Sequence, residues 1–91
     1  MFIVVTYDIP GDHRRNRVAK ALEGFGYRVQ FSVFECEVDE AQFRKMREKV
    51  AGRINPEEDS VRYYLICQSC LAKIIIDGLG QVQREKPLFV V

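Results

Sequence analysis

Apolar residues in this chain switch twice from the spacing of a strand to the spacing of a helix, and this order limits the folds that it can adopt. Residues 2–7 are all β-branched or aromatic and run into Asp8, which is typical of a strand. Pro10 and Gly11 interrupt the run, and Asp12 can cap the helix that we expect next. The apolar stripe of that helix comprises Val18, Ala21, Leu22 and Phe25. The helix ends at Gly24 and Gly26.

The second unit begins with the longest alternating stretch of the chain, residues 28–38. Eleven residues is long for a single strand, so we expect a bend or a tight hairpin near Ser32. Asp39 then opens a second helix, and Gln42 three residues later completes an approximate capping box. The buried stripe of this helix comprises Phe43, Met46 and Val50.

The last third of the chain holds another strand and two short apolar pieces. The strand covers residues 61–67, and the short pieces are residues 74–76 and 88–91. Strand, helix, strand pair, helix, strand is the order of the ferredoxin-like split βαβ plan. We therefore predict an α+β, ferredoxin-like single domain over residues 1–91, with an additional short C-terminal strand.

Two of the predicted strands, residues 2–7 and 63–67, are apolar on both faces. Two helices cover only one face of a sheet, and a large exposed apolar patch marks an interface. We therefore predict a homodimer packed sheet to sheet. The alternative is that the C-terminal tail folds back over the open face.

Charge is balanced over the whole chain but not along it. The net charge of +1 predicts no particular partner, yet residues 11–30 carry five basic residues against two acidic ones. Residues 35–60 are acidic instead, so one face can still be basic. The apolar runs are too short to span a bilayer and no signal peptide is visible, so we expect a cytoplasmic protein with three reduced cysteines.

Asp8 is the first candidate for chemistry, because it ends a hydrophobic strand at the edge of the predicted sheet. A Mg²⁺ site commonly uses one or two carboxylates with waters and substrate phosphate oxygens. A two-fold axis near the strand ends would bring in a second Asp8. The competing interpretation is structural, with Asp8 accepting hydrogen bonds from the turn amides at residues 10–12.

Arginines crowd the first turns of the first helix. Arg14 falls within its apolar arc, with Arg15 and Arg17 on either side, and a positive charge there opposes the helix dipole. Either Arg14 reaches a carboxylate such as Asp8, or the group is arranged for a phosphate. A solvated helix surface with ion pairs is the third interpretation.

Cys67 and Cys70 have the spacing of a metal or redox motif, but a zinc site needs four ligands. Only Cys36 and His13 remain as further soft ligands, and both are remote in sequence. We therefore interpret the cysteines as small buried apolar residues and His13 as a surface residue.

Three motifs in sequence order resemble the Cas-two family, the small second core protein of CRISPR adaptation. They are Thr-Tyr-Asp-Ile at residues 6–9, Arg-Arg-Asn-Arg-Val-Ala at residues 14–19 and Arg-Val-Gln-Phe-Ser-Val-Phe-Glu at residues 28–35. The Asp-Ser-Val-Arg-Tyr-Tyr segment and the spacing of Cys67 and Cys70 also occur in members. The resemblance covers essentially the whole chain and is weakest after Gly80.

This resemblance implies a ferredoxin-like homodimer that acts in spacer acquisition. Members are described as Mg²⁺-dependent endonucleases on single-stranded RNA, and some on double-stranded DNA. The resemblance assigns Asp8 as the metal-linked residue, facing its symmetry mate. By match, the other positions tied to activity are Tyr7, Arg15, Arg17, Arg28, Ser32 and Phe34. Mg²⁺ held by the Asp8 pair would polarise a phosphoryl oxygen and activate a water, while arginines contact phosphate.

The resemblance also implies a second class of function, because members bridge two dimers of the Cas-one integrase and hold the DNA that is inserted. Nothing in the sequence looks like a dedicated general base, so a non-catalytic adaptor stands beside the nuclease. A generic RNA-binding module is a weaker third hypothesis. It needs exposed aromatics on a sheet face that we expect the dimer to cover.

Overall fold

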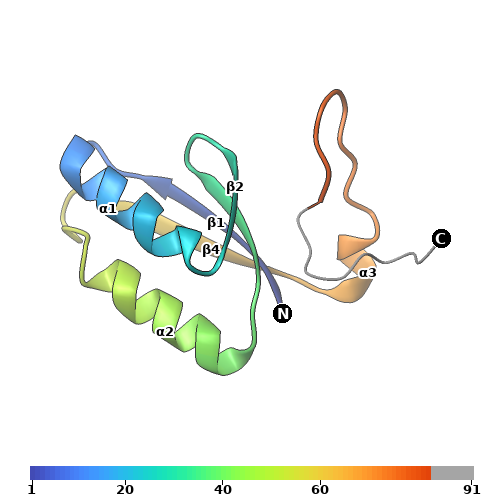
Figure 1. Cartoon of the computed structure of the whole chain (residues 1–91), viewed down its shortest axis with the longest axis horizontal. Helices are drawn as coiled ribbons and strands as arrows, with labels where there is room; N and C mark the ends of the chain where they lie inside the picture. Colours follow the sequence, from blue (N-terminus) through green and yellow to red (C-terminus); the bar gives the residue numbers. More distant parts are fainter. Residues whose placement is uncertain (83–91) are drawn as a thin grey trace.

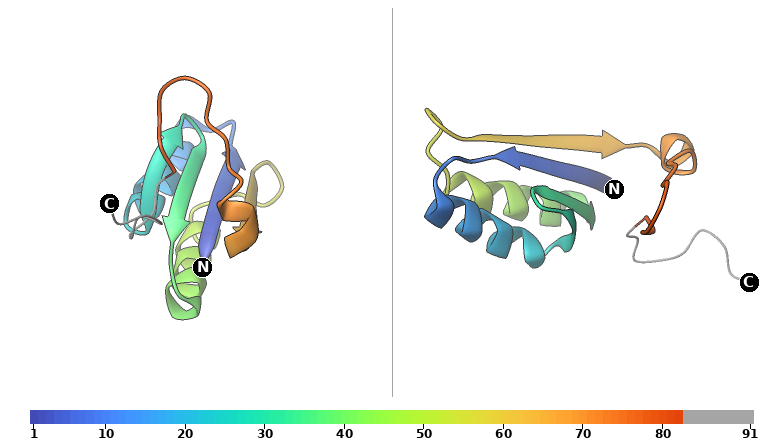
Figure 2. Two further views of the ribbon diagram at one scale, coloured as in Figure 1. Left: turned by 90° about the vertical axis from the view of Figure 1, so that its right-hand side faces the viewer. Right: turned by 90° about the horizontal axis from the view of Figure 1, so that it is seen from above.

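Two helices pack against one face of a four-stranded antiparallel sheet in the computed structural model, which describes residues 1–82 (Figures 1 and 2). The elements are β1 (Phe2–Asp8), α1 (Asp12–Glu23), β2 (Gly26–Gln30), β3 (Val33–Glu37), α2 (Glu40–Ala51), β4 (Ser60–Ile66) and the short α3 (Gln68–Leu71). The strand order is β2-β3-β1-β4. This is the ferredoxin-like arrangement, so the predicted fold class is confirmed.

The predicted C-terminal strand at residues 88–91 lies outside the described residues. Residues 74–76 form no strand, and they follow α3 as irregular chain. None of the helices within residues 1–82 combines the length and apolarity that a bilayer crossing requires.

The hydrophobic core lies between the sheet and the two helices. Alternate side chains of β1 point into it, and these are Ile3, Val5 and Tyr7. Phe34 and Cys36 of β3 lie beside them on the same face of the sheet. The helices cover this face with Val18 and Leu22 of α1 and Met46 and Val50 of α2. The predicted stripes of both helices are thus largely confirmed, with Phe43 packed at the margin of the core.

The second face of the sheet carries neither α1 nor α2, and we call it the open face. A row of paired residues crosses all four strands on this face: Tyr27, Glu35, Val4 and Tyr64. Because side chains alternate, Thr6 and Asp8 lie on the same face as Val4. The end of β1 therefore places its carboxylate on the side away from the helices.

Local signals explain how most elements begin and end. The predicted hairpin is confirmed, because β2 and β3 are joined by a turn at residues 31–32. The predicted capping box is also present: Asp39 Oδ1 accepts from the Gln42 N–H at 2.7 Å, and Gln42 Oε1 accepts from the Asp39 N–H at 2.9 Å.

The predicted cap of α1 is wrong by one residue. Gly11 is the N-cap, and Asp12 lies inside the first turn, where its carboxylate pairs with Arg15 at 2.5 Å. A carboxylate there is favourable because the amino end of a helix attracts negative charge.

Candidate active site at the carboxyl end of β1

Asp8 is the last residue of β1 and pairs with Ser60 of β4 in the sheet. Its side chain is exposed and has no hydrogen-bond or ion-pair partner within residues 1–82. The turn amides at residues 10–12 therefore do not hold the carboxylate, and the structural interpretation of Asp8 is wrong. The oxygens remain available for a ligand.

Tyr7, the neighbour of Asp8, points to the opposite side of the sheet and is only 5% exposed. Its hydroxyl donates a hydrogen bond to the Phe31 carbonyl at 3.3 Å and accepts one from Arg28 Nη2 at 3.1 Å. Its backbone N–H donates to the Ser32 carbonyl at 3.1 Å. Tyr7 thus joins the end of β1 to the tip of the β2–β3 hairpin.

Arg28 and Phe34 form the next part of the site. The Arg28 guanidinium lies over the Phe34 ring, 5.5 Å from its centroid, which is a cation–π geometry. Phe34 is fully buried, so it supports Arg28 and does not reach a substrate. Arg28 is exposed and keeps donors beyond the one used on Tyr7.

Arg15 approaches the same end of the sheet from α1. Its Nη1 donates to the Ile9 carbonyl at 3.1 Å, and its guanidinium lies 5.5 Å from the centroid of the Phe31 ring. The Arg15 Nε is buried and has no partner within residues 1–82. Phe31 itself is 71% exposed at the hairpin tip. Phe31 is not among the residues predicted for the site, although its place next to the predicted turn at Ser32 is a signal in the sequence.

Arg14 does reach a carboxylate, as one interpretation expects, but the carboxylate is not Asp8. The Arg14 Nε donates to Asp59 at 2.7 Å, and its Nη2 donates to Asp59 at 3.0 Å and to Glu58 at 2.9 Å. The side chain of Asp59 is completely inaccessible to solvent. The hydrogen bond from Arg14 holds the pKa of Asp59 below its ordinary value and raises the pKa of Arg14. Arg14 therefore fastens α1 to the segment before β4.

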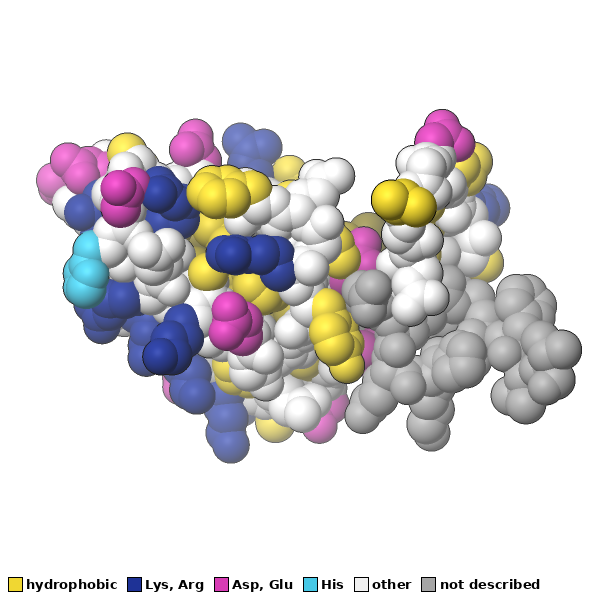
Figure 3. Space-filling view, turned by 45° about the horizontal axis from the view of Figure 1, so that its top comes forward, with side chains coloured by type: hydrophobic (Ala, Val, Ile, Leu, Met, Phe, Trp, Pro, Cys, Tyr) yellow, Lys and Arg dark blue, Asp and Glu magenta, His cyan; other side chains and the backbone are white. Residues whose placement is uncertain are grey.

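Arg17 does not join the residues at the end of β1. It is exposed and lines a groove with Lys20, Lys49 and Arg53 on the helical side of the molecule. In Figure 3, Lys and Arg side chains gather toward the lower left of the view. The structure thus divides the candidate residues: Tyr7, Arg15, Arg28, Ser32 and Phe34 lie near the end of β1, and Arg17 lies elsewhere.

The interpretation of the cysteines is correct for Cys36 and wrong for Cys67 and Cys70. Cys36 is buried, and desolvation raises the pKa of its thiol to about 11. Cys67 and Cys70 are exposed, because β4 ends at Ile66 and both thiols lie beyond the core at α3. Cys67 Sγ lies 3.2 Å from the Ser69 hydroxyl, and this hydrogen bond is the main cause that lowers the pKa of Cys67 to about 7.

His13 is exposed, as predicted. Within residues 1–82, no three His, Cys, Asp or Glu side chains gather in a group that could hold a metal ion.

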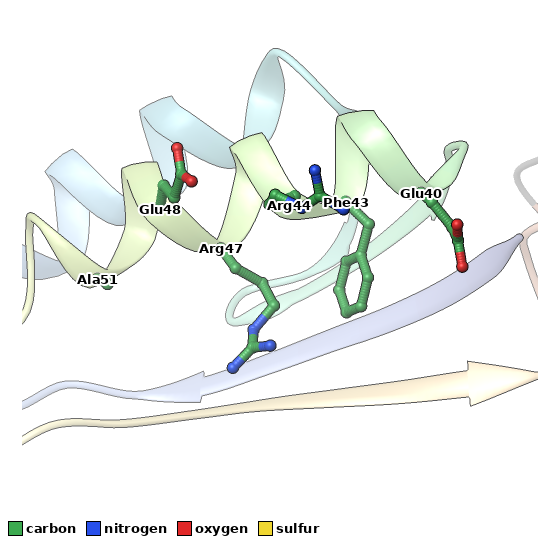
Figure 4. A pocket seen from close by; sticks show the side chains of 6 residues that line it. All are labelled: Glu40, Phe43, Arg44, Arg47, Glu48 and Ala51. Atoms are coloured by element: carbon green, nitrogen blue, oxygen red, sulfur yellow. The ribbon is translucent and has the colours of Figure 1, made fainter.

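A separate hollow of about 470 Å³ lies along α2 and contains none of the candidate residues (Figure 4). In this hollow the Arg47 guanidinium lies 5.9 Å from the ring centroid of Phe43 and 5.8 Å from that of Tyr63. Two acidic side chains, Glu40 and Glu48, and two basic ones, Arg44 and Arg47, line it, so it has no dominant charge. We assign it no catalytic role.

The family model described as CRISPR associated protein Cas2 matches residues 1–74. The chain belongs to this Cas2 family. This match confirms the family resemblance that the three sequence motifs indicated. The chain is 46% identical over 81 residues to CRISPR-associated endoribonuclease Cas2 1 of Chloroflexus aurantiacus, which covers 88% of this chain and 87% of that protein. It is 41% identical over 91 residues to CRISPR-associated endoribonuclease Cas2 of Thermus thermophilus, covering 99% and 97% of the two chains.

Solved structures of Cas2 proteins share the fold. Streptococcus pyogenes Cas2 matches with a TM-score of 0.77 and 36% identity over 86% of this chain and 100% of that one. A chain of a partial Cas6-RT-Cas1–Cas2 complex matches with a TM-score of 0.76 and 26% identity, covering 99% of this chain and 97% of that one.

Proposed function

We propose that this Cas2-family chain is a CRISPR-associated endoribonuclease that hydrolyses single-stranded RNA with Mg²⁺ held by Asp8. The observation that supports the proposal is the Asp8 carboxylate, which is exposed and has no partner within residues 1–82. Relatives that align over most of their length carry the name endoribonuclease, which favours the same reaction here. Double-stranded DNA is the second substrate class, since both nucleic acids present the same phosphodiester link.

The donor chemistry at Asp8 fits Mg²⁺, because this ion takes carboxylate oxygens and usually keeps several waters. One chain contributes one carboxylate, as no acidic cluster surrounds Asp8 among the described residues. The remaining ligands are expected to be water, substrate phosphate oxygens and the Asp8 of a second copy. Two Asp8 carboxylates brought together would repel unless a cation or a proton lay between them.

Asp8 lies on the open face, so in the proposal a homodimer formed through this face brings two Asp8 carboxylates together at the metal site. Tyr27 and Tyr64 on that face are 60% and 46% exposed. Packing two open faces together would remove these rings from water and bring the carboxyl ends of two β1 strands toward a two-fold axis. We therefore retain the sheet-to-sheet dimer as part of the proposal.

When bound, Mg²⁺ supplies charge neutralisation at the phosphate and lowers the pKa of a water molecule. Arg28 keeps donors beyond the one used on Tyr7 and lies on the helical side of the sheet, opposite Asp8, so in the proposal it contacts a substrate phosphate away from the metal site. Arg15 is held by Ile9 and Asp12 and presents its charge beside the exposed Phe31 ring. Tyr7, Phe34 and the Ser32 carbonyl are positioning groups, because they contact other protein groups.

A second function, the adaptor in spacer acquisition, is favoured by one specific observation. A chain in a Cas1–Cas2 assembly shares this fold over nearly all of its length. On this proposal the chain bridges Cas1 proteins and holds the incoming DNA, and Asp8 is not required. Cytoplasmic location follows from either role and agrees with the free thiols of all three cysteines.

A Mg²⁺-titrated cleavage assay with Asp8→Asn separates the two functions. This variant keeps the shape of the side chain but removes the charge that holds the ion. We expect RNA cleavage to fall by about three orders of magnitude while the fold, measured by circular dichroism, is unchanged. Assembly with Cas1 and spacer insertion should persist. Cleavage by the variant at the rate of the unmodified protein would show that Asp8 does not hold a catalytic metal.

A further inference from the structure

Two cysteines that the proposed nuclease site does not use lie together on one exposed turn after β4. Cys67 directly follows the strand, and Cys70 lies three residues later in α3. Both thiols are exposed and free. Figures 1 and 2 show α3 beyond the end of β4, away from the two long helices. The pair is therefore open to small molecules in solution.

Backbone hydrogen bonds hold this turn closed. The Leu71 N–H donates to the Cys67 carbonyl at 2.8 Å, and the Lys73 N–H donates to the Cys70 carbonyl at 3.0 Å. Leu71 is only 3% exposed, so its side chain anchors the turn to the rest of the protein. The two thiols are thus presented to solvent by a turn with a defined conformation.

The geometry of the turn suits a disulfide. Gln68 and Ser69, the residues between the cysteines, are helical. One helical turn separates the Cα atoms of Cys67 and Cys70 by about 5 Å. A disulfide requires Cα atoms about 4.4–6.8 Å apart, so the backbone permits a bond between these two residues.

The surroundings of the two thiols differ. Cys67 Sγ lies 3.2 Å from the Ser69 hydroxyl, which donates when Cys67 is a thiolate. This hydrogen bond, with smaller contributions from Cys70, lowers the pKa of Cys67 to about 7, whereas contact with Cys67 raises the pKa of Cys70. A thiol attacks disulfides best when its pKa is close to the ambient pH. Cys67 is therefore suited to attack first and Cys70 to attack second.

Metal binding is the other common use of two neighbouring thiols, and the surroundings do not favour it. A structural zinc ion takes four protein ligands. Among residues 1–82, no third His, Cys, Asp or Glu joins Cys67 and Cys70 in a group that could hold a metal ion. The remaining cysteine, Cys36, is buried in the core on β3. The pair is thus left for thiol chemistry between its own two members.

We propose that Cys67 and Cys70 form a reversible thiol–disulfide exchange site for low-molecular-weight disulfides of the glutathione class. The Cys67 thiolate attacks one sulfur of oxidised glutathione, the S–S bond breaks, and one glutathione leaves as its thiolate. Cys70 then loses its proton to solvent and attacks Cys67 Sγ, which releases the second glutathione. Two protein thiols are oxidised to one disulfide, and one oxidised glutathione is reduced to two glutathione molecules.

This site is independent of Asp8 and of either proposed role in CRISPR adaptation. Exposed disulfides are more easily reduced than buried structural ones, so the bond is expected to open again when the surroundings are reducing. While it exists, the bond closes the turn covalently in addition to the backbone hydrogen bonds that already hold it.

The test treats the reduced full chain with oxidised glutathione at pH 7, quenches the reaction with acid and maps the products by mass spectrometry. We expect the unmodified chain to hold a disulfide between Cys67 and Cys70 and no glutathione. Cys70→Ser should stop after the first step and keep one glutathione on Cys67. Cys36→Ala is the matched control and should behave like the unmodified chain, because Cys36 is buried. Dithiothreitol should restore both thiols.

The same reaction in urea separates a site built by the fold from two thiols that are close only in sequence. We expect the folded chain to close the disulfide about tenfold faster than the unfolded chain, because the turn holds the thiols together before they react. Ser69→Ala should slow the first step about threefold at pH 7, because the loss of thiolate outweighs the gain in nucleophilicity.

Equal rates of closure in the folded and unfolded chains would overturn the proposal. A lasting glutathione adduct on the unmodified chain would also overturn it, because Cys70 would then not resolve the mixed disulfide. A disulfide that joins two chains, detected as a doubled mass under non-reducing conditions, would contradict pairing within one turn.

Discussion

Arg28 of β2 reaches past β3 to donate a hydrogen bond to the Tyr7 hydroxyl of β1, at 3.1 Å. The same hydroxyl donates to the Phe31 carbonyl at the hairpin tip. One buried phenol therefore fixes both the direction of Arg28 and the position of the turn that carries Phe31. The positions of Arg28 and Phe31 near the end of β1 therefore depend on Tyr7, although the Tyr7 side chain does not reach the open face.

Tyr7→Phe removes this hydroxyl and leaves Arg28 and the Phe31 carbonyl without their partner. We expect a loss of about 1 kcal/mol in the free energy of unfolding, because a net hydrogen bond contributes about that much. We also expect kcat for RNA cleavage to fall about tenfold with little change in KM, because Arg28 loses its orientation. Tyr63→Phe is the control, since the Tyr63 hydroxyl has no hydrogen-bond partner within residues 1–82. An equal kinetic effect in both variants would contradict the positioning role of Tyr7.

Gly26→Ala tests the close approach of β2 to β3. A Cβ at Gly26 would lie 2.3 Å from the Glu35 carbonyl oxygen and 2.5 Å from Cys36 Sγ, so the strands must move apart. We expect a loss of about 1–3 kcal/mol in the free energy of unfolding, measured by urea denaturation. Gly24→Ala, two residues earlier, meets nothing closer than 3.5 Å and should be neutral or slightly stabilising.

Thiol alkylation should distinguish the cysteines by pH. The thiolate is the reactive form, so the rate at Cys67 should rise with pH through about 7, where its pKa lies. Buried Cys36, whose pKa is raised to about 11, should stay unmodified in the folded protein. Mass spectrometry after iodoacetamide treatment measures both. Ser69→Ala should move the Cys67 profile to higher pH, and an unmoved profile would show that the Ser69 hydroxyl does not stabilise the thiolate.

The Arg14–Asp59 pair predicts a pH dependence of stability. The folded pKa of Asp59 is depressed, so its contribution is present above the ordinary carboxyl pKa of 3.8 and is lost as pH falls through the folded value. Asp59→Asn should therefore be less stable than the unmodified protein at neutral pH, and the difference should shrink in acid. Thermal unfolding from pH 7 down to pH 2 measures this. Glu57→Gln changes an exposed neighbour, and its unfolding temperature should vary with pH in the same way as that of the unmodified protein.

Sedimentation equilibrium tests the open face as a dimer contact. The unmodified chain should sediment with twice its mass of 10.6 kDa. Tyr64→Lys places a charge on the open face and should give the monomer. Leu65→Lys is the matched control, because the next residue of β4 points to the opposite side of the sheet and is 57% exposed. A monomeric unmodified protein would contradict the dimer.

Local patterns in the sequence were sufficient for the secondary structure. The alternation in residues 28–38 with a turn at Ser32 predicted the hairpin, and Asp39 with Gln42 predicted the capping box that starts α2. These signals act between residues close in sequence, so they can be recognised without the fold. The position of Asp8 at the end of a strand was predictable for the same reason.

Contacts between distant segments were decided only by the tertiary structure. Arg14 pairs with Asp59, 45 positions away, because the fold brings the start of α1 beside the segment before β4. Arg17 joins Lys49 and Arg53 because α1 and α2 pack side by side, and its sequence neighbours Arg14 and Arg15 point elsewhere. Cys67 and Cys70 are exposed because β4 ends one residue before Cys67. Periodicity identifies which residues share a face, but the partner of a charge and the burial of a thiol depend on which other element packs against that face.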